Sequence, residues 1–139
     1  MNSTILTRNM NHYNLIDVRQ NHKQIVENMF KQYYEIEDTN HGNLAPYFTF
    51  NCQIVYQDNE FIGFSNFFNS LLNNGIFSIT HYHVALNSQA LNDRTILVMA
   101  SGIITYNHSS NMHHFSETFI LERDNLNNLF ITNHIFRTS

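Results

Sequence analysis

The stretch from Phe115 to Ser139 constrains the fold of this chain more than any other. It holds two runs rich in β-branched and aromatic residues, 115–122 and 129–137, which are typical of β-strands. Residues 123–128 between them read Arg-Asp-Asn-Leu-Asn-Asn, a polar composition that favours a turn. The pattern predicts a β-hairpin at the end of the sequence.

Both strands of this hairpin have two partly apolar faces. Side chains alternate across a strand, so Phe115, Phe119 and Leu121 share one face, interrupted by Glu117. In the second run, strict alternation places Phe130, Thr132, His134 and Phe136 on one face and Leu129, Ile131, Asn133, Ile135 and Arg137 on the other. An antiparallel sheet normally exposes one face to water, and the second face is too apolar for that. We therefore expect a partner to cover it.

Length, net charge and cysteine content limit which classes of protein this chain can belong to. A chain of 139 residues is expected to form one domain, and a net charge of −4 without a basic patch argues against direct nucleic-acid binding. The single cysteine, Cys52, excludes an internal disulfide, fits a reducing compartment and is expected to be a buried structural thiol. Neither a signal peptide nor a membrane-spanning run is visible, so we expect an intracellular protein without a membrane partner.

Helical signals come before strand signals along the rest of the chain. Ile25, Met29 and Tyr33 recur at helical spacing, so a helix is expected from Asn21 until His41-Gly42 breaks it. The elements expected after it are a short helix over 44–48, strands over 53–57 and 60–63, a helix over 66–73 capped by Ser65, and strands over 76–86 and 94–106. This order predicts an α+β fold, with helices packed in the concave face of a curved antiparallel sheet. We expect a flexible arm over residues 1–19 and one domain over residues 20–139.

The order of elements and five short motifs resemble the nuclear transport factor 2-like family over residues 20–139. The motifs are Gln32-Tyr33-Tyr34, Val55-Tyr56, Phe61-x-Gly63, Phe115-Ser116-x-x-Phe119 and Asn133-His134-Ile135-Phe136-Arg137. The resemblance implies a cone of helices and curved sheet that dimerises through its outer sheet face.

Departures from the family pattern favour one branch of it. Carriers that import Ran-GDP use acids at positions that correspond here to Gln57, Asn107 and Ser109, and all three are uncharged. Small members that pair with the large mRNA export receptor lack those acids and keep a closing Phe-Arg, as this chain does. His134 departs from both groups, which usually have Asp there.

The resemblance therefore implies a non-enzymatic nuclear transport scaffold without a cofactor. Its expected partner is a related domain of a large mRNA export receptor, or a second copy of itself, and the assembly would support binding to nuclear-pore Phe-Gly repeats while shuttling between nucleus and cytoplasm. The residues expected at the dimer interface are Met99, Thr118, Ile120, Ile131, Ile135 and Arg137. Two alternatives stay open: a homodimeric Ran-GDP import carrier and a small cavity enzyme of the ketosteroid isomerase-like type.

Histidine pairs and cavity residues are the side chains that could bind a metal ion or act in catalysis. His81-x-His83 would place two imidazoles on one strand face, and His113-His114 lies elsewhere, but the sequence gives no sign that these pairs converge, so no metal site is expected. An enzyme of this fold could use Tyr34, Tyr56 and His134 in its cavity. Because the inward set is mostly Phe and Tyr without a paired acid and base, no catalytic residue is expected.

Overall fold

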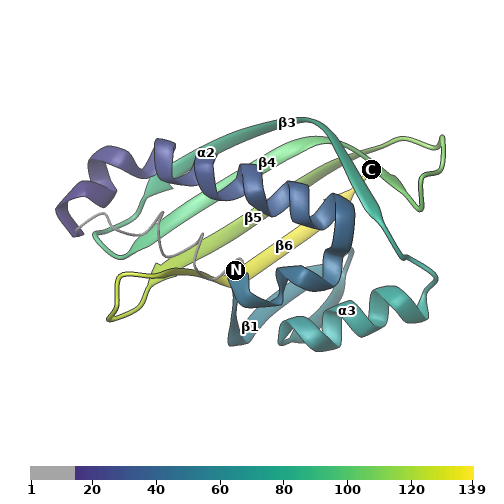
Figure 1. The fold of residues 1–139 in the computed structure, drawn as a ribbon, viewed down its shortest axis with the longest axis horizontal. Coiled ribbons are helices and arrows are strands. Elements are labelled where there is room, and N and C mark those ends of the chain that lie inside the picture. The colour runs from purple at the N-terminus through teal and green to yellow at the C-terminus, as the bar shows by residue number, and fades with distance from the viewer. Residues whose placement is uncertain (1–14) are drawn as a thin grey trace.

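The structure is a computed structural model that describes residues 15–139 and shows an α+β fold, as predicted (Figure 1). Its elements are α2 (Leu15–Asn40), the 3-10 helix η1 (His41–Tyr47), β1 (Phe48–Tyr56), β2 (Asn59–Ile62), α3 (Phe64–Asn73), β3 (Ile79–Ala90), β4 (Thr95–Tyr106), β5 (His113–Arg123) and β6 (Leu129–Thr138). None of the helices in this part of the chain combines the length and hydropathy of a membrane span.

The strands form one curved, open sheet in the order β2-β1-β6-β5-β4-β3. Four of the neighbouring pairs are antiparallel, but β1 and β6 pair in parallel, so the sheet is mixed and the expectation of an antiparallel sheet was wrong at this point. A tight turn forces its two strands to be antiparallel, whereas β1 and β6 are joined through most of the chain. Nothing local in the sequence therefore fixes their relative direction.

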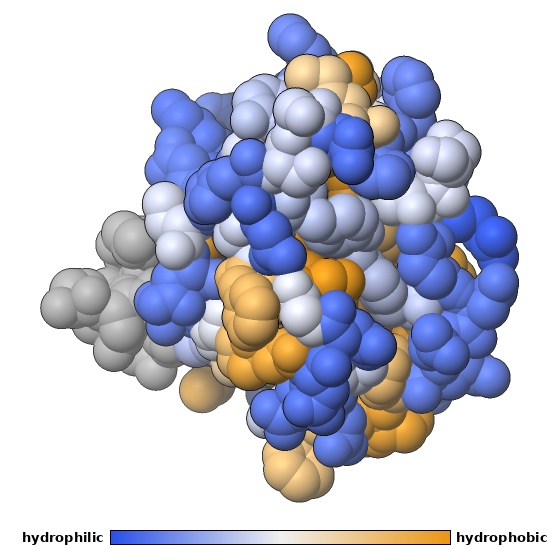
Figure 2. Space-filling view, turned by 90° about the vertical axis from the view of Figure 1, so that its right-hand side faces the viewer, coloured by the Kyte–Doolittle hydropathy of each residue, from blue (hydrophilic) through white to orange (hydrophobic). Residues whose placement is uncertain are grey.

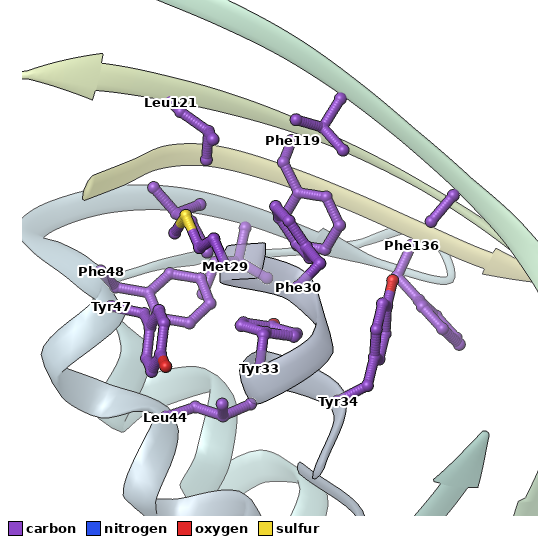
Figure 3. Close-up of a cluster of buried hydrophobic side chains, with 14 of the residues drawn as sticks. Met29, Phe30, Tyr33, Tyr34, Leu44, Tyr47, Phe48, Phe119, Leu121 and Phe136 are labelled. Atoms are coloured by element: carbon purple, nitrogen blue, oxygen red, sulfur yellow. The ribbon is translucent and has the colours of Figure 1, made fainter. Parts of the chain in front are cut away.

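Helix α2 lies across the concave face of the sheet, with its aromatic side directed at the strands (Figures 1 and 3). Two helical rows are buried there, Ile25-Met29-Tyr33 and Val26-Phe30-Tyr34, as the spacing predicts. The ring of Phe119 on β5 lies 4.7 Å from that of Phe30 and 5.6 Å from that of Tyr33, between ring centroids. These contacts make the helix and the central strands one core.

The helix begins earlier than predicted. It starts at Leu15 rather than Asn21, Val18 is buried in the core, and Arg19 contacts Asp93 at 2.7 Å. The end of the expected arm is therefore helical, and the packing of Val18 against the core stabilises this first part of the helix. The rest of the expected arm, residues 1–14, lies outside the described residues.

The start of α3 also differs from the expectation. Ser65 does not cap this helix; Gly63 holds the N-cap position at φ 85°, without a side-chain hydrogen bond, and Phe64 is already helical. A glycine suits this positive φ because other residues adopt it at a cost. The backbone N–H of Gly63 donates to the carbonyl of Cys52 at 2.8 Å, which fixes the chain as it leaves the sheet.

A bulge in β6 reverses part of the predicted strand alternation. Ile120 pairs with Asn133 but Leu121 pairs with Ile131, which leaves Thr132 as an extra residue in β6. Ile131 is consequently fully buried in the core, so its predicted place on the outer face is wrong. Phe130, predicted to face inward, is half-buried and pairs with the exposed Glu122. Period-two alternation fails at a bulge because a single extra residue inverts the faces on one side of the bulge relative to the other, here those of Phe130 and Ile131.

Because of the bulge, we expect replacement of two isoleucines of β6 by alanine to lower the free energy of unfolding by very different amounts. Ile131→Ala removes a fully buried side chain and should lower the free energy of unfolding by about 2–5 kcal/mol. Ile135→Ala, at a side chain that is 52% exposed, should change it by about 0.5 kcal/mol or less. Urea unfolding of both variants measures this, and equal costs would contradict the inverted faces.

Candidate functional site

The convex face of the sheet carries a strip of apolar side chains. Met99, Thr118 and Ile135 pair in register across β4, β5 and β6, and Ile120 pairs with Leu97 in the next row. We call Leu97, Met99, Thr118, Ile120 and Ile135 the convex strip. Met99 and Ile135 are 54% and 52% exposed, and the other three are partly exposed. The structure thus brings together four of the six residues that the sequence placed at an interface.

The other two predicted interface residues lie elsewhere or are already paired. Ile131 is in the core, as described above. Arg137 lies on the exposed side of β6, and its Nη2 donates to Oδ1 of Asp58 at 2.6 Å. The acidic partner that the sequence called for is therefore present within the chain. Both side chains are well exposed, so the pair stabilises the fold little and is free to exchange partners.

Two of the three positions compared above with the acids of Ran-GDP carriers lie in turns. Gln57 and Asn107 have φ values of 55° and 53°, and their side chains bind nearby backbone groups. Oδ1 of Asn107 accepts from the backbone N–H of Phe77 at 2.7 Å, and Oε1 of Gln57 accepts from that of Thr138 at 3.0 Å. These amides shape the ends of β1 and β4 and offer no carboxylate to a partner.

A cluster of ionisable side chains lies under the sheet, and sequence reasoning missed it. The buried polar cluster consists of Tyr34, Glu37, Asp38 and His41 from the end of α2 and the start of η1, with His81, Glu117 and His134 from β3, β5 and β6. The expectation that the interior holds no paired acid and base is therefore wrong. One signal was available: Glu37 continues the helical row Ile25-Met29-Tyr33, and Glu117 interrupts an inward Phe face.

The part of the cluster around His81 joins α2 to β3. Nδ1 of His81 lies 2.7 Å from Oδ1 of Asp38, which also accepts the backbone N–H of His81 at 3.2 Å. Nε2 of His81 lies 3.3 Å from Oε1 of Glu37, yet neither atom has a hydrogen-bond partner. His83 does not share this face, contrary to the expectation, because a bulge between Tyr82 and Ala85 leaves it exposed at φ 55°.

The part of the cluster around Glu117 joins α2 to β5 and β6. The hydroxyl of Tyr34 donates to Oε2 of Glu117 at 2.8 Å, and Nε2 of His134 lies 2.6 Å from Oε1. The ring of His134 stacks on Phe119 at 4.4 Å. Burial alone would raise the pKa of Glu117, but the hydrogen bond and charge of His134 outweigh it and hold that pKa below its ordinary value.

Three other side chains of the cluster, Glu37, His81 and His41, have pKa values far from their ordinary ones. Burial raises the pKa of Glu37 to about 8. Burial on its own would lower the pKa of His81, but the carboxylate of Glu37 and the hydrogen bond to Asp38 raise it to about 9. Burial lowers the pKa of His41 to about 4, although its Nε2 lies 3.3 Å from Oε2 of Glu37. The acidic side chains around His81 therefore favour its imidazolium form.

A cleft between α2 and β3 gives access to one side of the cluster. It has a volume of about 340 Å³ and is lined by Tyr34, Asp38 and His81 together with apolar side chains such as Val84 and Leu86. Glu37 and Glu117 lie behind this lining and are almost fully buried. The cleft therefore reaches the outer side of His81, whose side chain is itself almost fully buried.

Cys52 is a free, buried thiol, as expected, and burial raises its pKa, so it is a poor nucleophile. The end of the molecule at the β4–β5 loop is mostly hydrophilic, with apolar side chains in small separate patches (Figure 2). No broad apolar surface is visible there, in contrast to the convex strip.

A family profile and solved structures place the chain among known proteins. The profile of the nuclear transport factor 2 (NTF2) domain matches residues 25–138. The chain belongs to the NTF2 domain family. No curated protein matches its sequence.

The solved NTF2-like structures that resemble this chain differ widely in function. Nuclear transport factor 2 from Cryptosporidium parvum has a TM-score of 0.74 and 20% identity, covering 86% of this chain and 95% of that one. A putative scytalone dehydratase from Novosphingobium aromaticivorans has a TM-score of 0.70 and 17% identity, covering 89% and 88%. The complex of the yeast deubiquitinase Ubp3 with its cofactor Bre5 contains a chain with a TM-score of 0.64 and 19% identity, covering 84% and 96%. At these identities the likeness shows the fold alone.

The pKa shifts of Glu37 and His81 predict how the stability of the protein depends on pH. Their folded-state values, about 8 and about 9, lie above the ordinary values of 4.5 and 6.5, so the folded chain binds more protons than the unfolded chain. Below pH 6.5 the opposite shift of the pKa of His41, to about 4, offsets that of Glu37, whereas between pH 6.5 and 9 both Glu37 and His81 lower the free energy of unfolding as pH rises. The shift of His81 alone, from 6.5 to about 9, corresponds to a fall of about 3 kcal/mol. Urea unfolding in the presence of a chelator measures it.

Two variants of α2 test the origin of this fall. Glu37→Gln removes the buried carboxylate and with it the main cause that raises the pKa of His81, so its stability should vary much less with pH. Glu35→Gln, at an exposed position on the same helix, is the control and should follow the wild type. A Glu37→Gln curve as steep as that of the wild type would contradict the assignment.

Proposed function

We propose that this NTF2 domain is a non-enzymatic scaffold that dimerises through the convex strip. The observation that carries the proposal is the exposure of Met99 and Ile135 in one register row of a sheet whose other face is already covered by α2. An aligned row of apolar side chains on a rigid sheet is the composition expected at the centre of an interface. Polar neighbours such as Asn87 on β3 and Ser116 on β5 supply a rim.

The partner that we propose is a related NTF2-like domain of a large mRNA export receptor. The uncharged Gln57, Asn107 and Ser109 support this choice over Ran-GDP, since charge-assisted hydrogen bonds contribute about 1.5–3 kcal/mol each. Arg137 supports it too, because its exposed pair with Asp58 can exchange for a carboxylate of a partner. Such an assembly would bind nuclear-pore Phe-Gly repeats and shuttle between nucleus and cytoplasm. The Bre5–Ubp3 complex gives a precedent for an NTF2-like chain as a cofactor of a larger protein.

Sedimentation of the purified chain, alone and mixed with the NTF2-like domain of the export receptor from the same organism, tests this proposal. We expect a one-to-one heterodimer in the mixture. A homodimer that does not exchange with the receptor domain would support the strip as an interface and overturn the choice of partner. A chain that remains monomeric in both samples would overturn the proposed function.

Charged substitutions in the strip locate the interface. Met99→Glu and Ile135→Glu would bury a carboxylate without a partner and should each weaken assembly by at least about 30-fold, a loss typical of a central interface residue. Leu126→Glu, at an 80% exposed side chain in the β5–β6 turn, is the matched control and should assemble normally. Circular dichroism should show all three variants folded. Assembly of both strip variants at wild-type strength would exclude this face.

A second candidate, proton-transfer catalysis, is favoured by the contact between His81 and Asp38 at the wall of an open cleft. A histidine oriented by a carboxylate is a common general base. It ranks second because the pKa of His81, about 9, leaves the imidazole protonated at neutral pH.

Deuterium exchange of a panel of small enolisable ketones, followed by NMR, tests this candidate. The scaffold proposal predicts the buffer rate with the wild-type chain. Exchange that is catalysed by the wild type and by His83→Gln, but not by His81→Gln, would replace the scaffold with an enzyme. His83 is the matched control because it lies exposed on the same strand.

A further inference from the structure

We propose that Glu37, His81 and Glu117 form a binding site for one divalent transition-metal ion, and that Zn²⁺ fits it. One ligand atom from each residue lies within 4.8 Å of the other two, and each comes from a different element: α2, β3 and β5. Two carboxylates and one imidazole form a mixed oxygen and nitrogen set, which suits Zn²⁺ better than Mg²⁺ or Ca²⁺. The inference is independent of the proposed scaffold function.

The spacing of two of these atoms matches metal coordination better than a hydrogen bond. Oε1 of Glu37 and Nε2 of His81 lie 3.3 Å apart, but the geometry forms no hydrogen bond and neither atom has another partner. Two ligands bound to zinc at about 2.0–2.1 Å in a tetrahedral arrangement are about 3.3 Å apart. Both side chains are more than nine-tenths buried, so water does not satisfy these atoms freely.

Neighbouring groups hold the imidazole in the orientation that a metal needs. Nδ1 of His81 bonds Oδ1 of Asp38 at 2.7 Å, which leaves Nε2 as the atom directed at Glu37 and Glu117. A metal-binding histidine commonly donates its other ring N–H to a carboxylate in this way, and the contact fixes both its tautomer and its ring plane. Asp38 would thus be a positioning residue and not a ligand.

Glu117 is held in a similar way from behind. The hydroxyl of Tyr34 donates to its Oε2, and Nε2 of His134 bonds its Oε1, so the carboxylate cannot turn away from the site. Each carboxylate oxygen has more than one lone pair, so these hydrogen bonds leave room for a metal bond. Glu37 and Glu117 are both buried, and a divalent cation between them would offset their mutual repulsion.

The cleft is the route by which an ion would enter, and a bound ion would link three elements of the fold. The cleft between α2 and β3 opens onto His81 and Asp38, which form the outer edge of the site. A bound ion would join the end of α2 to β3 and β5, which already meet here through hydrogen bonds, ion pairs and ring contacts. Zinc should therefore stabilise the whole domain.

Competition with a chromophoric chelator for Zn²⁺, using protein without a purification tag, measures the affinity and the stoichiometry. We expect one site per chain with a submicromolar Kd, together with a rise of roughly 10 °C in Tm at a 100-fold excess of Zn²⁺ over Kd. Glu37→Gln and His81→Gln should each weaken binding by at least about 100-fold, and Asp38→Asn by about 10- to 100-fold. Glu35→Gln, on the same helix but exposed, should bind as the wild type does.

Surface histidines are the competing explanation for any zinc that binds. His114→Ala removes an exposed imidazole of the His113-His114 pair and should leave the affinity unchanged. Absence of stoichiometric binding by the wild type would overturn the inference. So would affinity that survives in Glu37→Gln but is lost in His114→Ala. Because glutamine keeps the shape of glutamate and removes a buried charge, Glu37→Gln should stay folded, and circular dichroism checks this.

Discussion

The packing of the aromatic side of α2 into the concave sheet is the contact on which the rest of the structure depends. Phe30 and Tyr33 meet Phe119 at the centre of the sheet, and these rings are almost completely buried. The same helical row continues to Glu37, so the helix that closes the core also carries a carboxylate into it. Because burying a lone charge is costly, Glu37 needs protons or cations nearby, and His41 and His81 lie against it. Core packing and the buried polar cluster are therefore consequences of one helix face.

The concave and convex faces of the sheet serve different purposes. Packing against α2 uses the concave face, so an interface formed by a face of the sheet has to use the convex one. Met99 and Ile135 remain exposed there, whereas Arg137 is tied to Asp58 at the edge. The metal site that we infer is on the concave side, which means that loss of the metal and loss of the partner can be measured separately.

The sequence was sufficient to predict elements that are defined by local periodicity, and insufficient where an extra residue changes the register. The helical rows of α2, the order of helices and strands along the chain, and the family followed from spacing and motifs. The bulge at Thr132 was not predicted, so Ile131 was assigned to the wrong face, and the bulge after Tyr82 separated His83 from His81 in the same way. The buried polar cluster also escaped prediction, because its members come from α2 and three strands that only the folded sheet brings together. Its one local sign was an acidic residue in an otherwise apolar row.

Oxidation of individual methionines by dilute peroxide, in the free chain and in the assembled complex, tests the central claim most directly. Met99 on the convex strip and Met112 in the β4–β5 loop are 54% and 67% exposed, so both should oxidise readily in the free chain, while the buried Met29 should not. If the convex strip is the interface, assembly should slow the oxidation of Met99 at least roughly 10-fold and leave Met112 unchanged, because oxidation follows exposure. Equal rates for Met99 in the free and assembled chain would contradict the account.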